Sequence, residues 1–458
     1  MICSDVPVNR HSLEDQYVGV ISDMSSIDKL KRLTGENKKP VESTVQQRPE
    51  IEELRRRIDA IMMRGREKEG SSVKRKLNTG LDNLRDFVSG EEIENDQGKF
   101  FLASDVVAGS SRHGHRNIRE TFDFDITAAA MLANNPLISE FGAGDALFLD
   151  TETTGLAGGT GTMAFLIGLG WFEAGHFQVR QLLARDFSEE AAALTCLAEI
   201  AGQKKFLVTF NGKAFDVNLL TARFIMNRLE CGLNQLPHLD LLHPSRRILG
   251  HRLANSRLVT LEAEVLGVER AGDIPGWEIP QRYFDWLKSR DGRLLAAIFE
   301  HNRLDVISMA SLTAHLAEII DARSLMQDAH ADDYLAAARL LLNRRNLEGT
   351  EKILNIFREQ SCPDFSALSK RKLAHLYKRT GRLNEAVQIW QEMAVCLPVE
   401  FPAISELAKW LEHHAHDCGC ALRLIENALS QDNTFSAEEK ASLLHRLKRL
   451  NTKLDGSR

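Results

Sequence analysis

The chain lacks any apolar run that approaches membrane-spanning length, and its first residues lack a basic region followed by an apolar one. Neither a membrane anchor nor a secretory leader is therefore expected. Its seven cysteines are scattered and show no paired spacing of the kind that binds zinc. We interpret them as reduced thiols, as is usual in the cytoplasm. No glycine-rich loop is followed by Lys and then Ser or Thr, so ATP is not implied as a ligand.

Positive charge is not in excess either. The formal net charge of −6 excludes a broadly basic coat, so any contact with nucleic acid must be local. The 458 residues, 43% of them hydrophobic, are enough to bury more than one core. The sequence therefore predicts a cytoplasmic protein of two or three domains.

Four regions differ in their residue pattern. Residues 1–98 are polar, charge-dense and poor in aromatic side chains, which predicts a mostly disordered region. Residues 99–141 are expected to form a lead-in segment packed on the domain that follows. Apolar strands and helical patterns share the stretch 142–322, which predicts an α/β domain. Residues 328–456 are helical throughout and repeat.

Asp150 and Glu152 are the most informative feature of the α/β region. They follow the apolar run Leu147–Leu149, and because side chains alternate along a strand they share one face. Two neighbouring carboxylates repel each other unless a cation neutralises them. Their oxygens suit Mg²⁺ or Mn²⁺. The alternative is a strand end whose acids merely face water.

A third acid follows another predicted strand. Phe206–Phe210 is patterned as a buried strand, Asn211 and Gly212 as a tight turn, and the chain from Lys213 as a helix. Asp216 is therefore expected in a first helical turn, just past the end of a central strand. Acids favour that position for dipole reasons alone, but ligands of open sheets also bind at this edge.

The fourth acid, Asp305, interrupts the apolar face of a long helix predicted over 294–320, together with Asn302. An unpaired carboxylate directed at a core is strongly unfavourable, whereas one that binds a metal or pairs with a cation is not. His301 is a helical neighbour of Asp305. Such a histidine is either a hydrogen-bonded core residue or a catalyst, and beside a candidate metal ligand we favour the catalyst.

These motifs, in this order, resemble the DEDD superfamily of 3′–5′ exonucleases and, within it, the YprB-type ribonuclease-H-like family. The matching segments are Asp150–Gly161, Phe210–Asp216, His238–His243, Asp273–Gly276 and His301–Asp305. The resemblance implies an α/β ribonuclease-H-like domain with a mixed sheet and flanking helices. The spacing of His301 and Asp305 is that of the superfamily's tyrosine subtype, and this departure leaves the role of His301 open.

The resemblance also implies that two divalent ions, Mg²⁺ or Mn²⁺, clamp the attacking and leaving oxygens of a phosphodiester. It implies that Asp150 bridges both ions and that Glu152 and Asp305 complete the site of the attacking water. Asp216 would hold the second ion, partly through water. His301 would orient or deprotonate the nucleophile, a task that suits an imidazole.

Candidate substrate contacts surround these acids in the sequence. Arg246 and Arg247 belong to a basic stretch without acids, which is suited to binding a phosphate backbone, although a solvated face is the alternative. Lys213 and Asn211 flank the predicted rim, and Asn211 could equally serve only the turn. The candidate substrate contacts are Thr151, Thr153, Asn211, Lys213, Arg246, Arg247 and Asn302.

The helical region carries the spacing of small and large residues that is typical of tetratricopeptide repeats. The clearest unit comprises Leu373, Ala374, Tyr377, Gly381, Ala386 and Trp390, and related units precede and follow it. Three units suffice for a small solenoid, whose concave face is expected to recruit a protein partner. Shielding of the nuclease and self-association are the alternatives.

The sequence therefore predicts a metal-dependent nuclease, with 3′–5′ exonuclease activity on DNA or RNA as the leading hypothesis. One alternative is a nucleic-acid-binding scaffold of weak catalysis that acts through its repeats. The other is a structure-selective endonuclease. The choice between DNA and RNA depends on contacts to the sugar 2′ position, which no motif here encodes.

Overall fold

The computed structural model describes residues 84–155, 161–230, 232–322, 330–359, 366–396, 398–431 and 435–455. All of these residues belong to one compact unit, Asn78–Arg458. Residues 1–83, which make up most of the region expected to be disordered, lie outside the described residues.

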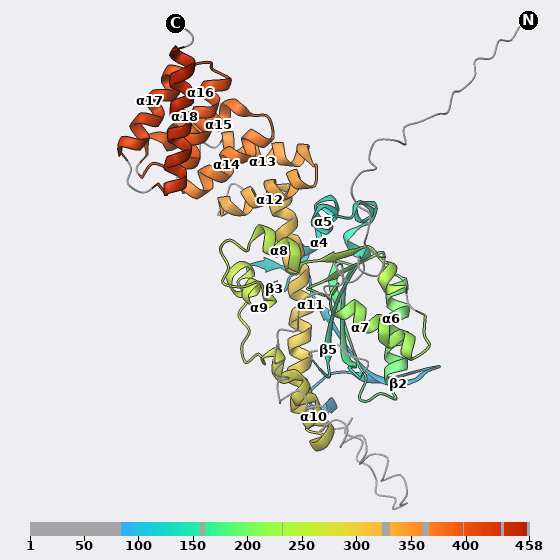
Figure 1. Ribbon diagram of the computed structural model, residues 1–458. Helices are drawn as coiled ribbons and strands as arrows, with labels where there is room; N and C mark the ends of the chain where they lie inside the picture. Colours follow the sequence, from blue (N-terminus) through green and yellow to red (C-terminus); the bar gives the residue numbers. More distant parts are fainter. Residues whose placement is uncertain are drawn as a thin grey trace, which may run out of the picture. The chain divides into compact units, whose positions relative to one another are not determined.

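A seven-stranded sheet with the strand order β1-β2-β7-β6-β5-β8-β9 forms the centre of the α/β domain (Figure 1). Its strands are β1 Glu91–Asn95, β2 Gly98–Val107, β5 Ala146–Thr153, β6 Ala164–Glu173, β7 His176–Leu183, β8 Phe206–Thr209 and β9 His238–Asp240. Strands β5, β6 and β7 form an antiparallel meander, whereas β8 pairs in parallel with β5 and with β9. This mixed sheet confirms the predicted α/β fold. Strands β3 Arg112–His113 and β4 Arg116–Asn117 form a separate two-stranded ribbon.

The sheet begins earlier in the chain than the sequence predicted. Strand β1 lies inside the region expected to be disordered, and β2, which opens the expected lead-in, pairs with both β1 and β7. The side chains that pack this part of the sheet into the core are Phe100, Phe101 and Leu84, all fully buried. Because these few apolar side chains stand among many polar ones, average composition hid them, and the boundary predicted at residue 98 is corrected.

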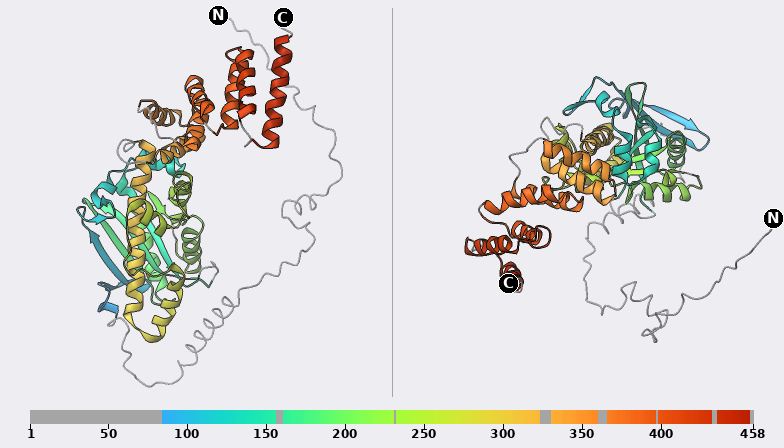
Figure 2. Two further views of the ribbon diagram at one scale, coloured as in Figure 1. Left: turned by 90° about the vertical axis from the view of Figure 1, so that its left-hand side faces the viewer. Right: turned by 90° about the horizontal axis from the view of Figure 1, so that it is seen from above.

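Helices cover both faces of the sheet (Figures 1 and 2). The helices of this domain are α4 Ile118–Phe122, α5 Ile126–Ala133, α6 Glu190–Gly202, α7 Asp216–Met226, α8 Leu242–Ile248, α9 Leu258–Leu261, α10 Ile279–Ser289 and α11 Gly292–Asp321. Helix α11 crosses β5, β6 and β7 on one face, whereas α6 and α7 lie on the other (Figure 1). Every residue of β6 except the last is buried, as expected for a strand with both faces covered.

Short helical turns complete the α/β domain. The 3₁₀ turns are Pro136–Glu140, Ala143–Asp145, Leu233–Gln235 and Gly276–Glu278, and a π-helical turn spans Glu262–Leu266. Turns of the π type are frequent at functional sites. This one carries Glu262, which is fully buried and belongs to the polar network described below.

The region after the α/β domain is helical. Its helices are α12 Ala331–Asn343, α13 Leu347–Glu359, α14 Ala367–Arg379, α15 Leu383–Val395, α16 Phe401–His413, α17 Cys418–Gln431 and α18 Ala437–Asp455. Consecutive helices pack in the pairs α12/α13, α14/α15 and α16/α17, with α18 against α17. Gly381 joins α14 to α15 at a φ of +80°, a left-handed conformation that favours glycine.

The first helix of this region packs directly on the α/β domain. Helix α12 contacts α8 and α11 and shares a hydrophobic core with them. Asp333 of α12 is buried and accepts hydrogen bonds from the guanidinium of Arg252, the nearest at 3.0 Å. Among the described residues, no helix combines the length and the apolar character that crossing a bilayer requires.

Candidate active site

The sheet and helix α11 together position the first two acids. Asp150 and Glu152 lie at the end of β5, and the partner of Asp150 across the sheet is Gly168 of β6. Both carboxylates are largely shielded from solvent. Burial, and then the charges of Asp305 and Asp216, raise the pKa of Asp150 well above its usual range. Burial and the charge of Asp150 do the same to the pKa of Glu152.

Asp216 joins the same cluster from the opposite face of the sheet. It is the first residue of α7, as the sequence predicted, and the hydroxyl of Thr151 donates a hydrogen bond to its Oδ1 atom. Burial raises the pKa of Asp216 to about 6, although the bond from Thr151 works in the other direction. Helix α7 is therefore tied to β5 through Thr151, the residue after Asp150.

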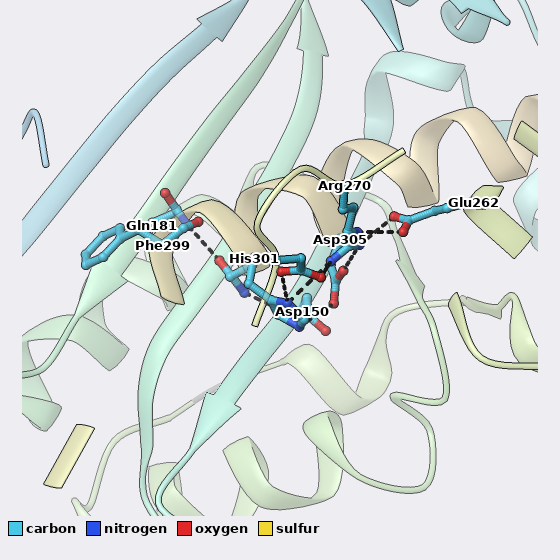
Figure 3. A network of polar contacts seen from close by, with 9 residues as sticks. Asp150, Gln181, Glu262, Arg270, Phe299, His301 and Asp305 are labelled. Atoms are coloured by element: carbon cyan, nitrogen blue, oxygen red, sulfur yellow. Dashed lines mark hydrogen bonds and ion pairs between the residues drawn. The ribbon is translucent and has the colours of Figure 1, made fainter. Parts of the chain in front are cut away.

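Helix α11 supplies Asp305 and the residue that orients Asp150. The Nδ2 atom of Asn302, which is fully buried, donates to Asp150 Oδ2 at 2.9 Å. Gln181 of β7 donates to Asn302 Oδ1 at 2.9 Å (Figure 3). A Cβ at Gly168 would lie 2.2 Å from that same oxygen, so only glycine leaves room for Asn302 beside the strand.

His301 lies one residue before Asn302 and is also buried. Its Nδ1 atom is 2.7 Å from Asp273 Oδ1, and its Nε2 atom is 3.7 Å from Asp305 Oδ2. Burial opposes ionisation of Asp273, but the contacts with His301 and Arg270 lower the pKa of this carboxyl. Asp273 therefore orients the imidazole from one side while the other ring nitrogen faces the acidic cluster.

Arg270 is the cation that contacts this cluster. Its guanidinium forms ion pairs with Glu262 and Asp305 and, at 3.1 Å, with Asp273 (Figure 3). Burial disfavours its charge, yet the contacts with Glu262 and Asp305 hold the pKa of Arg270 above its ordinary value. The charge of Arg270 also lowers the pKa of Asp150, but burial and the charges of Asp305 and Asp216 raise that pKa by more.

Four carboxylates are the donor set that Mg²⁺ and Mn²⁺ prefer. Their mutual repulsion, with Arg270 as the cation beside them, leaves the cluster short of positive charge, which is a second sign that it fits a divalent cation. Among the described residues no three His, Cys, Asp or Glu side chains converge as ligands. A divalent ion would have to compete with Arg270 for Asp305.

Several expected substrate contacts have structural roles instead. The expected contact of Asn302 with the substrate is corrected, because its fully buried amide donates a hydrogen bond to Asp150. The hydroxyl of Thr151 is bonded to Asp216, and Thr153 donates to the carbonyl oxygen of Gly155 at 2.9 Å. Sequence reasoning chose these residues by their nearness to the acids along the chain, which does not determine where a side chain points.

The remaining expected contacts lie at the surface of the domain. Lys213, Arg246 and Arg247 are exposed. Asn211 has a φ of +68° and forms the turn after β8, where its N–H donates to Asp240 Oδ1 at 2.8 Å. Asp240 also accepts from the backbone N–H groups of Lys213 and Leu242, so it acts as a structural anchor for this rim.

The sequence analysis missed Arg270, Glu262 and Gln181, and it did not place Asp273 among the site residues. Glu262 carried only a weak signal, because Glu264 is a second acid in the same stretch, Leu258–Leu266. No comparable signal marked Arg270. Its partners stand 8 and 35 residues away in the chain, and only folding brings them together.

Comparison with known proteins agrees with this geometry. A family model described as the RNase H superfamily matches residues 147–317. The uncharacterized protein YprB of Bacillus subtilis (strain 168) is 35% identical over 311 residues, which cover 67% of this chain and 74% of the relative. The chain belongs to the YprB family of RNase H-like proteins. This membership supports a nuclease-type hydrolase activity and binding of a nucleic acid substrate.

The raised pKa of Asp216 predicts how the stability of the metal-free protein depends on pH. A carboxyl whose pKa is about 6 when folded, against 3.8 ordinarily, stabilises the fold below about pH 4. That contribution is lost as the pH rises through 6. As the pH rises from about 4 to about 6, we expect the melting temperature of the Asp216→Asn variant to increase relative to that of wild type, with both measured in EDTA. A constant difference would contradict this.

Proposed function

We propose that this protein is a metal-dependent nuclease that removes nucleotides from 3′ ends of DNA or RNA by a two-metal mechanism. The observation that supports the proposal is that Asp216 of α7 and Asp305 of α11 lie close enough to the acids of β5 for their charges to raise the pKa of Asp150 and Glu152. The fold, which is that of the RNase H superfamily, supports the same chemistry. Packing alone gives no reason to gather four like charges.

The proposed ligands of the two ions are Asp150, Glu152, Asp216 and Asp305. When bound, such ions supply Lewis acidity for the attacking water and the leaving oxygen. The chain's own groups do the rest. Asn302 fixes the orientation of Asp150, and Thr151 fixes that of Asp216. No covalent intermediate with the protein is part of this proposal.

His301 is proposed as the group that takes the proton of the attacking water. A neutral imidazole that donates from Nδ1 to Asp273 keeps the lone pair of Nε2 directed at the acids. Replacement by asparagine, which cannot take up that proton, should lower kcat by about 10²–10⁴-fold, the usual contribution of general acid–base catalysis.

The pH profile of kcat separates this role from a structural one. If His301 takes the proton of the attacking water, the pH dependence of kcat should differ between wild type and His301→Asn. Its melting temperature should be compared with that of wild type, because His301 is buried. An unchanged pH profile together with retained activity would show that His301 is a structural residue.

The mode of cleavage is tested with end-labelled single strands and closed circles, each of DNA and of RNA, in Mg²⁺ or Mn²⁺. Degradation of open ends alone supports the exonuclease. Cleavage of circles would indicate an endonuclease instead. If wild type and an Asp150→Ala variant behave alike on every substrate, the scaffold hypothesis replaces the proposal.

A further inference from the structure

Two neighbouring hollows lie where the helical region meets the α/β domain. The first, of about 780 Å³, extends from Lys213 and Asp240 to Arg344 at the end of α12. The second, of about 730 Å³, continues over α14 and α16. They share Arg247, Ala336 and Arg339, so they form one continuous depression, which we call the junction groove.

The junction groove is strongly basic in its first part. Lys213, Arg247, Arg339 and Arg344 line it, and none of them has an acidic partner within the part of the chain that the structure describes. The acid in this lining, Asp240, is already satisfied by three backbone N–H groups. This stretch therefore has four cations that lack a counter-charge, in a protein whose formal net charge is −6.

The environment of Arg344 adds a second, independent sign. Its Nη2 atom donates to the carbonyl oxygen of Leu132 at 3.2 Å, but its Nη1 atom is buried without a hydrogen-bond partner. Burial and the charge of Arg247 lower the pKa of Arg344 to about 10. Buried donors are normally paired, so an anion in the groove would satisfy both the free donor and the crowded charges.

The second part of the groove combines cations with an apolar floor. Arg371, Lys372 and Lys378 line it together with Leu335, Met393 and Trp390, and Arg371 and Lys372 pair with Glu400 and Asp332. The acid in this lining, Glu406, is paired with Lys378 and with Lys409, which lies outside it. A groove with charged walls and an apolar floor suits a ligand that has phosphates on one side and bases on the other.

One end of the groove is lined by Lys213 and Asp240. Lys213 belongs to the short segment between β8 and α7, three residues before Asp216. Phe215, the residue before that acid, is 57% exposed and presents an aromatic face at this rim. A strand whose end lies at the acids would thus continue past Lys213 into a basic path.

From this placement we propose that the helical region binds single-stranded nucleic acid along the junction groove and guides its end to the acids. The inference rests on the proposed nuclease function and deepens it, because it assigns the region a nucleic acid ligand instead of a protein partner. An acidic peptide is the competing ligand. The exposed ring of Phe215, two residues after Lys213, on which a base can stack, favours the nucleic acid.

Binding can be measured without cleavage by using full-length Asp150→Asn protein in EDTA with a fluorescently labelled single strand. The test variant adds Arg339→Gln, which removes an exposed side chain without an acidic partner. Anisotropy titrations over a series of salt concentrations should give a slope of log affinity on log salt that is shallower by about 0.7, the value for one lost phosphate contact. Lys448→Gln, an exposed residue of α18 outside the groove, should match the parent.

Cleavage by otherwise wild-type protein supplies the second measurement. Arg339→Gln should slow the degradation of long strands, whereas Lys448→Gln should not. Equal slopes for Arg339→Gln and Lys448→Gln would overturn the inference, as would competition by polyglutamate that exceeds competition by an oligonucleotide of the same charge. If the groove binds strands but wild type cleaves none in Mg²⁺ or Mn²⁺, the nuclease proposal fails and the groove assignment stands.

Discussion

Replacing Asp150 by asparagine should abolish hydrolysis and, at the same time, make the metal-free protein more resistant to unfolding. Loss of an outer-shell partner of a metal ligand commonly costs about 10–100-fold, so loss of Asp150, a proposed ligand itself, should cost more than about 100-fold. The structural gain has a separate cause. Burial and the neighbouring acids disfavour the charged form of Asp150, and asparagine carries no charge.

Two measurements check this prediction together. Activity is followed on end-labelled strands in Mg²⁺ and Mn²⁺, and melting temperature is followed in EDTA near neutral pH. The matched control is Asp96→Asn in the exposed turn between β1 and β2, which should change neither quantity. A lower melting temperature for Asp150→Asn would contradict the view that the acids repel one another, since the fold would then depend on that charge.

Replacing Arg270 by glutamine should cause the largest loss of stability among the site variants. Glu262 is fully buried, and its carboxylate accepts hydrogen bonds from Arg270 at 2.5 and 2.6 Å. Removing one partner of a buried ion pair leaves the other charge uncompensated, which costs roughly 3–5 kcal/mol. Asp305 would also lose its cation and add to the repulsion within the cluster.

Chemical denaturation in EDTA measures the effect, and a double variant identifies its cause. Arg270→Gln combined with Glu262→Gln should recover much of the lost free energy of unfolding, because no buried charge then lacks a partner. The exposed pair of Arg293 and Asp291 supplies the control, and Arg293→Gln should change stability little. A double variant no more stable than the single one would show that packing, not charge, causes the loss.

Local patterns were enough to predict much of the fold. The meander of β5, β6 and β7 follows from apolar runs separated by turns, and α11 follows from one apolar face repeated over many turns. Strand β1 could not be predicted in this way. It is short and mostly polar, and it forms a hairpin with β2, which is itself held in the sheet by pairing with β7, far along the chain.

The candidate site, too, could be predicted from the sequence only in part. Asp150, Glu152, Asp216 and Asp305 could be found because each is a charged residue where a strand end or an apolar helix face should be. Asn302 was identified as part of the site but given the wrong task, since only the packing of α11 on β6 shows that its amide points at Asp150.

The sequence by itself determined which acids this protein can use and which elements carry them, because strand and helix periodicity depends only on neighbouring residues. The tertiary structure alone decided that Arg270 joins Glu262 to Asp305 and that the basic groove runs from Lys213 onto α12. Asp305 lies 35 residues from Arg270, and the groove joins segments that are farther apart still. The formation of these contacts depends on how whole elements pack, and no local pattern encodes that.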